Sequence, residues 1–239
     1  MTDGLGALTA LATLPAADET VLLLVRHGET DWNMDRRIQG QLDLPLNDVG
    51  EQQAMAAAAR FEPGMVDVLY TSDLQRAAST AAPIARRLGL RVWADTCWRE
   101  RHFGEFQGWR YQQIAEQCPE VFARMEARDP EQDLSGGESL DAFMQRVRAG
   151  LAQIVARHLG QRVVLVSHGG VLDCIYRQAT GILLSAPRSF PVYNASLNSL
   201  RWKDGRWQVE VWADIGHLVD SRDELDPRQR ASQRAGRIG

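Results

Sequence analysis

The sequence predicts an α/β layered fold with a mainly parallel sheet. Two short and continuously apolar runs, "VLLLVR" and "RVVLVS", are typical of strands that are buried on both faces. Segments with helical character follow the strands, and this alternation is the pattern of parallel α/β sheets. Asp204-Gly205, inside the alternating stretch "LNSLRWKDGRWQVEVWA", is a hairpin signal and adds one late antiparallel pair.

The elements are expected in a regular order along the chain. Strands are predicted at three short apolar runs, over residues 21–26, 66–72 and 162–167. Helices are predicted in the segments between and after these strands, over residues 48–60, 73–88, 111–128 and 138–158, and after Gly170.

Two of these helices have a predicted start signal. Asn47 is a plausible N-cap for the first helix, and Ser72 or Asp73 would cap the helix that ends near Leu88. Pro83 lies inside that second helix, where we expect it to kink the helix or to force a local adjustment.

Composition and charge exclude several classes of protein. The chain has 239 residues, which suits one large single-core domain, and its net charge of −4 argues against a general nucleic-acid binder. No apolar run approaches the ~20 residues that span a bilayer. Three widely spaced cysteines without a CxxC pair indicate free thiols in a reducing compartment, so we expect a cytoplasmic protein.

The domain is expected to fill most of the chain. Residues 1–19 are interpreted as a flexible N-terminal extension, residues 20–219 as the folded domain, and residues 220–239 as a disordered, arginine-rich tail.

Charged residues follow three of the predicted strands or their turns. The first strand ends at Arg26-His27-Gly28, "TSDLQR" after the second brings Arg76, and the third leads into His168-Gly169-Gly170. Ligands of open α/β sheets bind beyond the carboxyl ends of the strands, so these side chains are expected at one edge. Arginine matches a phosphate or carboxylate bidentately, and glycine lets the backbone approach a ligand. The pattern favours an anion site, most naturally for phosphate.

A histidine in such a site can be a metal ligand, a general base or a nucleophile. The flanking arginines and the spacing disfavour metal binding. No serine or cysteine nucleophile motif accompanies the histidines, so attack by neutral imidazole on a phosphoryl group fits best. The leaving alcohol then needs a proton, which predicts a carboxyl group close by.

Six motifs in order resemble the histidine phosphatase superfamily, the phosphoglycerate-mutase-like proteins. The resemblance covers roughly residues 20–217 and is carried by "LVRHGETDWNMDRRIQGQLDLPLNDVGEQQA", "YTSDLQRAASTA", "WRERHFGEFQGW", "SGGESLDAFMQRV", "VLVSHGGVL" and "YNASLNSLRW". It implies a three-layer α/β/α sandwich with a mostly parallel central sheet. It also implies that neither a metal nor a cofactor is needed.

The resemblance assigns the catalytic roles. His27 would be the phosphorylated nucleophile. Arg26, Arg76 and His168 would hold the phosphoryl group and stabilise its transition state. Glu100 would protonate the leaving group and then act as a base on water. Other carboxylates could take this last role and remain open as alternatives, namely Glu105, Asp31, Glu29 and Asp95.

The expected substrate-binding residues extend this set. Asn33 would donate a hydrogen bond to the phosphate, and Gln39 and Gly40 would lie on the pocket wall. Gly28 and Gly169 would let the backbone approach the ligand, beside Arg26 and Arg76. Arg36 and Arg37 either meet a second anionic group or are simply solvated.

The family contains both phosphatases and mutases. A mutase needs additional positive charge in the lid, whereas here the interval 105–136 is short and its acidic residues outnumber its arginines. "SHGG" is also similar to the phosphatases, although "ERHFG" is close to the mutase pattern. We therefore predict a phosphomonoesterase acting on a small phosphorylated metabolite, with neither nucleic acid nor membrane as partner. A phosphoglycerate mutase and a non-catalytic phosphate-binding regulator are the alternatives, and a homodimer is left open.

Overall fold

The computed structural model describes residues 14–218, and no helix within them has both the length and the apolar character that a membrane span requires. The predicted tail over residues 220–239 and most of the predicted extension, residues 1–13, lie outside the described residues. Residues 14–19 lead into the first strand, and Glu19 forms an ion pair with Arg201 at 3.0 Å.

The described strands form one six-stranded sheet in the order β3-β2-β4-β1-β5-β6. Their bounds are β1 Thr20–Arg26, β2 Val68–Thr71, β3 Val92–Ala94, β4 Arg162–Ser167, β5 Leu197–Lys203 and β6 Arg206–Asp214. β3, β2, β4 and β1 are parallel, and β5 joins β1 in the antiparallel direction. The prediction of a mostly parallel α/β sheet with a late hairpin is confirmed. The edge strand β3 was not predicted, because it has only three residues and no buried face.

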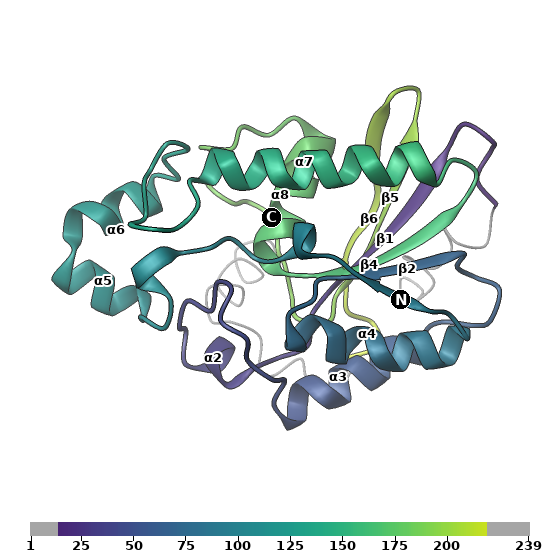
Figure 1. Ribbon diagram of the computed structural model, residues 1–239, viewed down its shortest axis with the longest axis horizontal. Helices are drawn as coiled ribbons and strands as arrows, with labels where there is room; N and C mark the ends of the chain where they lie inside the picture. Colours follow the sequence, from purple (N-terminus) through teal and green to yellow (C-terminus); the bar gives the residue numbers. More distant parts are fainter. Residues whose placement is uncertain (1–13, 219–239) are drawn as a thin grey trace, which may run out of the picture.

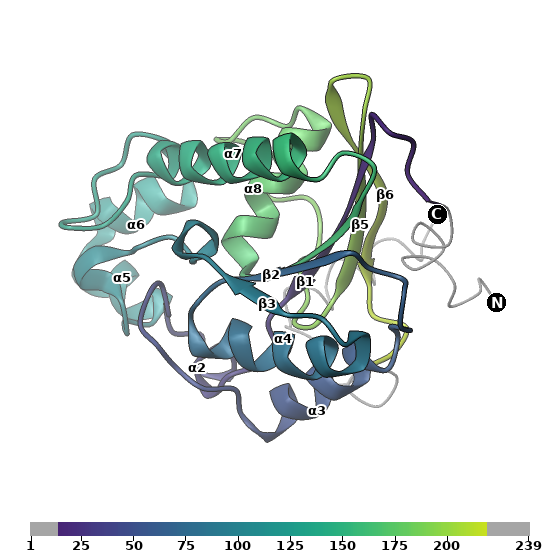
Figure 2. The same ribbon diagram turned by 45° about the vertical axis from the view of Figure 1, so that its right-hand side comes forward.

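Helices cover both faces of the sheet, as Figures 1 and 2 show. Two pairs make up these layers, α3 Asp48–Ala58 with α4 Gln75–Leu88 and α7 Leu140–Arg157 with α8 Gly169–Thr180. Side chains of β1 alternate between them: Leu23 and Val25 pack with the first pair, and Leu22 and Leu24 with the second. Because both faces are covered, residues 21–25 of the strand are all apolar. The predicted three-layer sandwich is confirmed.

One of the two predicted helix N-caps is confirmed. Asn47 caps α3, and its side chain accepts a hydrogen bond from the backbone N–H of Gly50 at 2.8 Å. The predicted cap of α4 is wrong, since Leu74 occupies the N-cap position and Asp73 instead pairs with Arg99. The helix continues through Pro83.

A broken helix replaces the single one predicted over residues 111–128. α5 Tyr111–Gln117 ends before Cys118, and α6 Pro119–Glu126 begins at the proline. Proline disfavours helical geometry in the residue before it and suits the first position of a helix, which accounts for the break. Both helices pack on a separate small core that includes Ile114.

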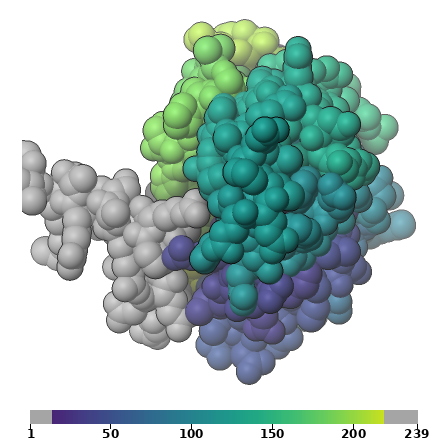
Figure 3. Space-filling view, turned by 90° about the vertical axis from the view of Figure 1, so that its left-hand side faces the viewer, coloured from purple at the N-terminus to yellow at the C-terminus, as the bar shows by residue number. Residues whose placement is uncertain are grey.

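Three further short elements complete the described chain, namely α2 Asp31–Met34, η1 Thr96–Trp98 and η2 Gly104–Phe106. In Figure 3 the teal segment with α5 and α6 lies against the purple segment with α2. An ion pair between Arg110 and Asp35 at 3.0 Å joins these two segments. Together they flank the carboxyl edge of the sheet, where the predicted site lies.

A close backbone approach fixes the turn after β1 against α3. A Cβ atom at Gly28 would collide with the carbonyl oxygen of Gly50, and one at Gly50 would collide with the carbonyl oxygen of Glu29. We expect Gly50→Ala to lower the free energy of unfolding by about 1–3 kcal/mol, because backbone must move to admit the methyl group. Urea denaturation measures this. Gln52→Ala, on the exposed side of the same helix, should change it by less than about 0.5 kcal/mol.

Candidate active site

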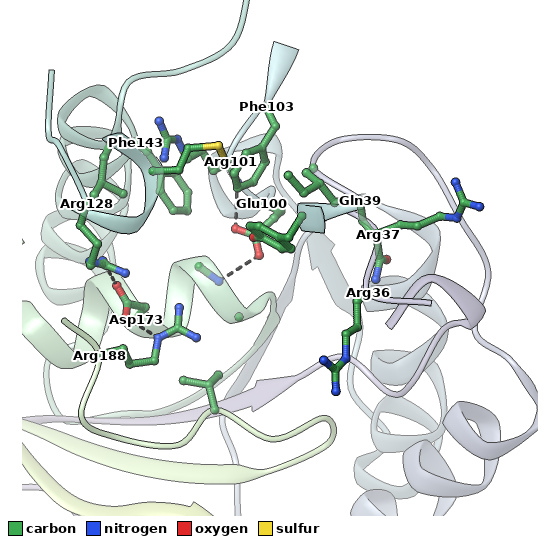
Figure 4. A pocket seen from close by; sticks show the side chains of 18 of the residues that line it. Arg36, Arg37, Gln39, Glu100, Arg101, Phe103, Arg128, Phe143, Asp173 and Arg188 are labelled. Carbon is green, nitrogen blue, oxygen red and sulfur yellow. Dashed lines mark hydrogen bonds and ion pairs between the residues drawn. The ribbon is translucent and has the colours of Figure 1, made fainter. Parts of the chain in front are cut away.

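A cavity of about 600 Å³ opens at the carboxyl edge of the parallel strands. Its wall is rich in charge, with seven arginines and four carboxylates, namely Arg26, Arg36, Arg37, Arg76, Arg101, Arg128, Arg188, Glu100, Glu126, Asp129 and Asp173. Figure 4 shows Arg36 and Arg37 on one wall and Arg128 and Arg188 on the opposite one. The excess of arginine makes the cavity attractive to anions.

His27 directly follows β1 and contributes to the cavity wall, although the residue is only 3% exposed. Its Nδ1 lies 2.7 Å from the carbonyl oxygen of Gly28. A carbonyl can only accept, so Nδ1 carries the proton and donates it. The lone pair of the neutral ring is therefore on Nε2. This tautomer leaves Nε2 available as a nucleophile.

The surroundings of His27 also keep its ring neutral. Burial lowers the pKa of His27 well below 6.5, and the positive charges of Arg76 and Arg26 lower it further. Neutral imidazole is the nucleophilic form, so the arginines that would bind an anion also keep the nucleophile active.

This tautomer can be observed directly. At about pH 6, where an ordinary histidine with a pKa of about 6.5 is mostly protonated, we expect His27 to remain neutral with its proton on Nδ1. A long-range ¹H–¹⁵N spectrum reports both ring nitrogens, and a His27→Gln variant assigns the signals. Two protonated ring nitrogens at that pH would contradict the assignment.

Arg76 is a buried cation without a carboxylate bound to it in the described part of the chain. Its Nη1 donates to the carbonyl oxygen of Leu42 at 2.8 Å, and its Nη2 donates to that of Gly40 at 2.7 Å. Nε has no partner among residues 14–218. Burial lowers the pKa of Arg76 to about 10, against the opposing effects of Glu100 and Asp43, so the group is still charged at neutral pH. A buried charge of this kind requires an anion.

Arg26 and His168 complete the positive end of the cavity. Arg26 donates from Nη1 to the carbonyl oxygen of Val192 at 2.6 Å, and its guanidinium lies beside Gly169. His168 is fully buried at the start of α8, with its ring centroid 5.2 Å from that of His27. Neither of its ring nitrogens has a partner in the described structure.

Unpartnered buried donors are rare in folded proteins and call for an explanation. Burial and the charge of Arg76 lower the pKa of His168 well below 6.5, so its ring is neutral and one of its nitrogens carries a proton. A phosphoryl group beside His27 would accept hydrogen bonds from the ring of His168 and from Nε of Arg76. The site is thus preorganised for an oxyanion, which is the chief requirement of phosphoryl transfer.

Glu100 lies in the same cavity and is held by two backbone amides. Its Oε1 accepts from the N–H of Arg101 at 2.8 Å, and its Oε2 accepts from the N–H of Gly170 at 2.9 Å. The other carboxylates considered from the sequence are absent from the cavity wall, namely Glu105, Asp31, Glu29 and Asp95. Glu29 and Asp95 instead accept hydrogen bonds that stabilise local structure. Glu100 is the predicted carboxylate that the fold brings into the cavity.

Of the remaining predicted residues, some line the cavity and one supports the turn that holds His27. Asn33, Gln39 and Gly40 line the cavity, and Gly40 also holds Arg76 through its carbonyl oxygen. The Oδ1 atom of Asn33 accepts from Thr30 in a capping box, while no described residue accepts from its Nδ2. Gly28 does not line the cavity; its observed contacts support the turn that holds His27.

Sequence analysis overlooked two features of the site. Asn194 donates from Nδ2 to the carbonyl oxygens of His27 at 3.0 Å and Gly28 at 3.2 Å, so it holds the nucleophile's turn. It lies in the quoted segment "YNASLNSLRW", which was the available signal. Asp173 and Arg188, at the far end of the cavity, carried no motif signal.

Comparison with known proteins agrees with this geometry. The family model described as "Histidine phosphatase superfamily (branch 1)" matches residues 22–215. The chain belongs to the histidine phosphatase superfamily. Phosphoglycerate mutase-like protein 4 of Arabidopsis thaliana is 40% identical over 208 residues, which are 85% of this chain and 89% of that protein.

Members of the superfamily with phosphatase names are similarly close. The metal-independent phosphoserine phosphatase of Arabidopsis thaliana is 38% identical over 205 residues, 84% of either chain. The structure of a mycobacterial glucosyl-3-phosphoglycerate phosphatase superposes with a TM-score of 0.71 at 34% identity, covering 82% of this chain and 99% of that one. The predicted family and the phosphatase class are confirmed.

Proposed function

We propose that the protein hydrolyses small phosphomonoesters through a phosphohistidine intermediate on His27. The observation that carries this proposal is the neutral His27, with its Nε2 lone pair available, beside the buried cation Arg76. Glu100 in the same cavity supplies the acid and base that the reaction requires. The superfamily's use of phosphohistidine supports the assignment.

In the first step, Nε2 of His27 attacks phosphorus while the bond from phosphorus to the ester oxygen breaks. Glu100 in its acid form gives the leaving oxygen a proton, so that an alcohol departs. Arg26, Arg76 and His168 accommodate the negative charge on the three equatorial oxygens. Nδ1 keeps its proton throughout, and the carbonyl oxygen of Gly28 stabilises the positive ring of phosphohistidine.

In the second step, the Glu100 carboxylate takes a proton from water as the water oxygen attacks phosphorus. The bond from phosphorus to Nε2 breaks, and inorganic phosphate leaves. Glu100 ends in its acid form and His27 ends neutral, so the site is ready for another turnover.

A mutase reaction is the second candidate, and the charge of the cavity wall favours it. Sequence analysis indicated an acidic lid, with six acidic residues between Glu105 and Gly136. Only two of them, Glu126 and Asp129, line the cavity. Of the three lid arginines only Arg128 lines it, so most of the positive charge on the wall comes from other segments, for example from Arg36, Arg37 and Arg188. An enzyme that holds a second phosphate requires such charge. The relatives with phosphatase names support hydrolysis, and the mutase-like relative supports the alternative.

Turnover of 3-phosphoglycerate, followed by ³¹P NMR with a chelator present, tests the proposal. We expect inorganic phosphate to accumulate, with p-nitrophenyl phosphate cleaved in parallel. Conversion to 2-phosphoglycerate without phosphate release would establish the mutase instead. Binding of these compounds without any turnover would favour the non-catalytic alternative.

A further inference from the structure

At the end of the cavity beyond Glu100, three arginines surround one buried carboxylate. We propose that Arg188 and Arg128, held in place by Asp173, form a second anion site that binds a carboxylate on the leaving group of the substrate. This inference rests on the proposed function, because it treats the cavity as a phosphomonoesterase site. It identifies the substrates as small phosphomonoesters that also carry a carboxylate.

Asp173 organises the cluster from α8. Its side chain is 3% exposed and forms ion pairs with Arg128 at 2.6 Å, Arg177 at 2.9 Å and Arg188 at 2.8 Å. One carboxylate offsets only one of these three guanidinium charges. Arg177 is fully buried and sits within helix α8, four residues after Asp173. Asp173 therefore leaves two positive charges of the cluster without an ion-pair partner of their own, although the charge of Glu100 also acts on Arg188. Arg128 and Arg188 line the cavity.

The donor groups of Arg188 are well suited to a ligand. Its Nε donates a hydrogen bond to Oδ1 of Asp173 at 2.8 Å. Neither Nη1 nor Nη2 has an acceptor among the described residues. The side chain is 42% exposed and lines the cavity. Because its Nε is held, the two terminal nitrogens are oriented without being used, as bidentate recognition of a carboxylate requires.

Arg128 adds a second donor from a different segment. It donates from Nε to the carbonyl oxygen of Leu184 at 2.9 Å and from Nη2 to Asp173, while Nη1 has no partner within residues 14–218. Its backbone has a φ of 52°, in the left-handed region that a residue with a Cβ atom rarely adopts. Figure 4 shows Arg128 and Arg188 on either side of Asp173.

The helix sets the distance from this cluster to the reacting group. Gly170 binds Glu100 through its N–H, and Asp173 follows three residues later on the same helix. Residues three apart lie on one helical face, separated by about 5 Å along the axis. Glu100 is assigned to the ester oxygen, so a group on Arg188 would lie a few bonds beyond that oxygen. The charge of Glu100 also acts on Arg188, so the two groups are near neighbours in the cavity, and we take a three-carbon leaving group as the compound to test.

The test compares two substrates that differ in one group. 3-Phosphoglycerate carries the carboxylate, and glycerol 3-phosphate has a hydroxymethyl group in its place. We expect Arg188→Gln to lower kcat/KM for 3-phosphoglycerate by about 10- to 100-fold, the scale of one charge-assisted hydrogen bond. For glycerol 3-phosphate the change should stay within about twofold. Arg148→Gln replaces an exposed arginine of α7 outside the cavity and should leave both values unchanged.

The possible outcomes separate the two proposals. An equal loss for both substrates would overturn the second anion site. A third substrate, 1,3-propanediol bisphosphate, carries a second phosphate and no carboxylate. A loss confined to it would assign Arg188 to a second phosphate and would also overturn the proposal. Absence of His27-dependent turnover with either substrate would instead remove the proposed function. Arg188→Lys keeps the charge and should give an intermediate loss with 3-phosphoglycerate, which guards against misfolding of Arg188→Gln.

Discussion

Replacing His27 with alanine is expected to reduce kcat/KM for phosphate release by at least about 10⁴-fold. The variant lacks the atom that forms the bond to phosphorus, and removal of a nucleophile from a covalent mechanism has effects on this scale. Arg76, Arg26 and His168 remain, so the variant should still bind phosphate esters. Steady-state kinetics measures the loss. Acid quenching of the unmodified enzyme and detection of acid-labile, base-stable phosphate measure the intermediate directly.

A second histidine provides the matched control for this variant. His158 lies at the opposite end of β1, where its carbonyl oxygen accepts from the Thr20 hydroxyl at 2.9 Å. His158→Gln should keep the activity and the phosphoenzyme signal in whatever fraction folds. A His27→Ala enzyme that retains more than about one tenth of its activity would show that another group attacks phosphorus.

Replacing Glu100 with glutamine is expected to have effects that depend on the leaving group. Alkyl phosphates need a proton on the departing oxygen, so their turnover should fall by about 10²- to 10⁴-fold. p-Nitrophenolate leaves without a proton, and the phosphoenzyme should still form from its ester. The second step lacks its base, so we expect a burst of one equivalent of nitrophenolate followed by slow turnover. Stopped-flow absorbance measures the burst.

The glutamine variant keeps the local structure, because its carbonyl oxygen can still accept from the N–H of Gly170 or Arg101. Glu105→Gln is the control, since Glu105 is exposed and outside the cavity. If Glu100→Gln slowed both classes of ester equally and gave no burst, Glu100 would not be the acid.

The centre of the site could be predicted because its signals are local. His27 and His168 each follow an apolar strand, and parallel strands bring their carboxyl ends to one edge. The break at Pro119 also has a local signal that the prediction did not use, since proline disfavours helical geometry in the residue before it. The cap of α4 was missed because Asp73 binds Arg99, a tertiary contact that capping rules do not include.

The far end of the cavity could not be predicted, for a physical reason. Arg128, Asp173 and Arg188 come from a lid segment, a helix and a loop, and only the packed fold brings them together. The count of charges along the lid segment did not reveal this cluster either, because most of its charged residues, acidic and basic alike, lie away from the cavity wall.

The order of strands in the sheet has a consequence for synthesis of the protein. β1 pairs with β4 and β5, which begin at Arg162 and Leu197. A growing chain therefore carries the apolar segment before His27 without either of its partner strands until most of the domain has been translated. Pairings this distant in sequence form late and leave unpaired strands open to aggregation. We expect a ribosome-stalled chain that ends before Leu197 to lack phosphatase activity and to depend on chaperones.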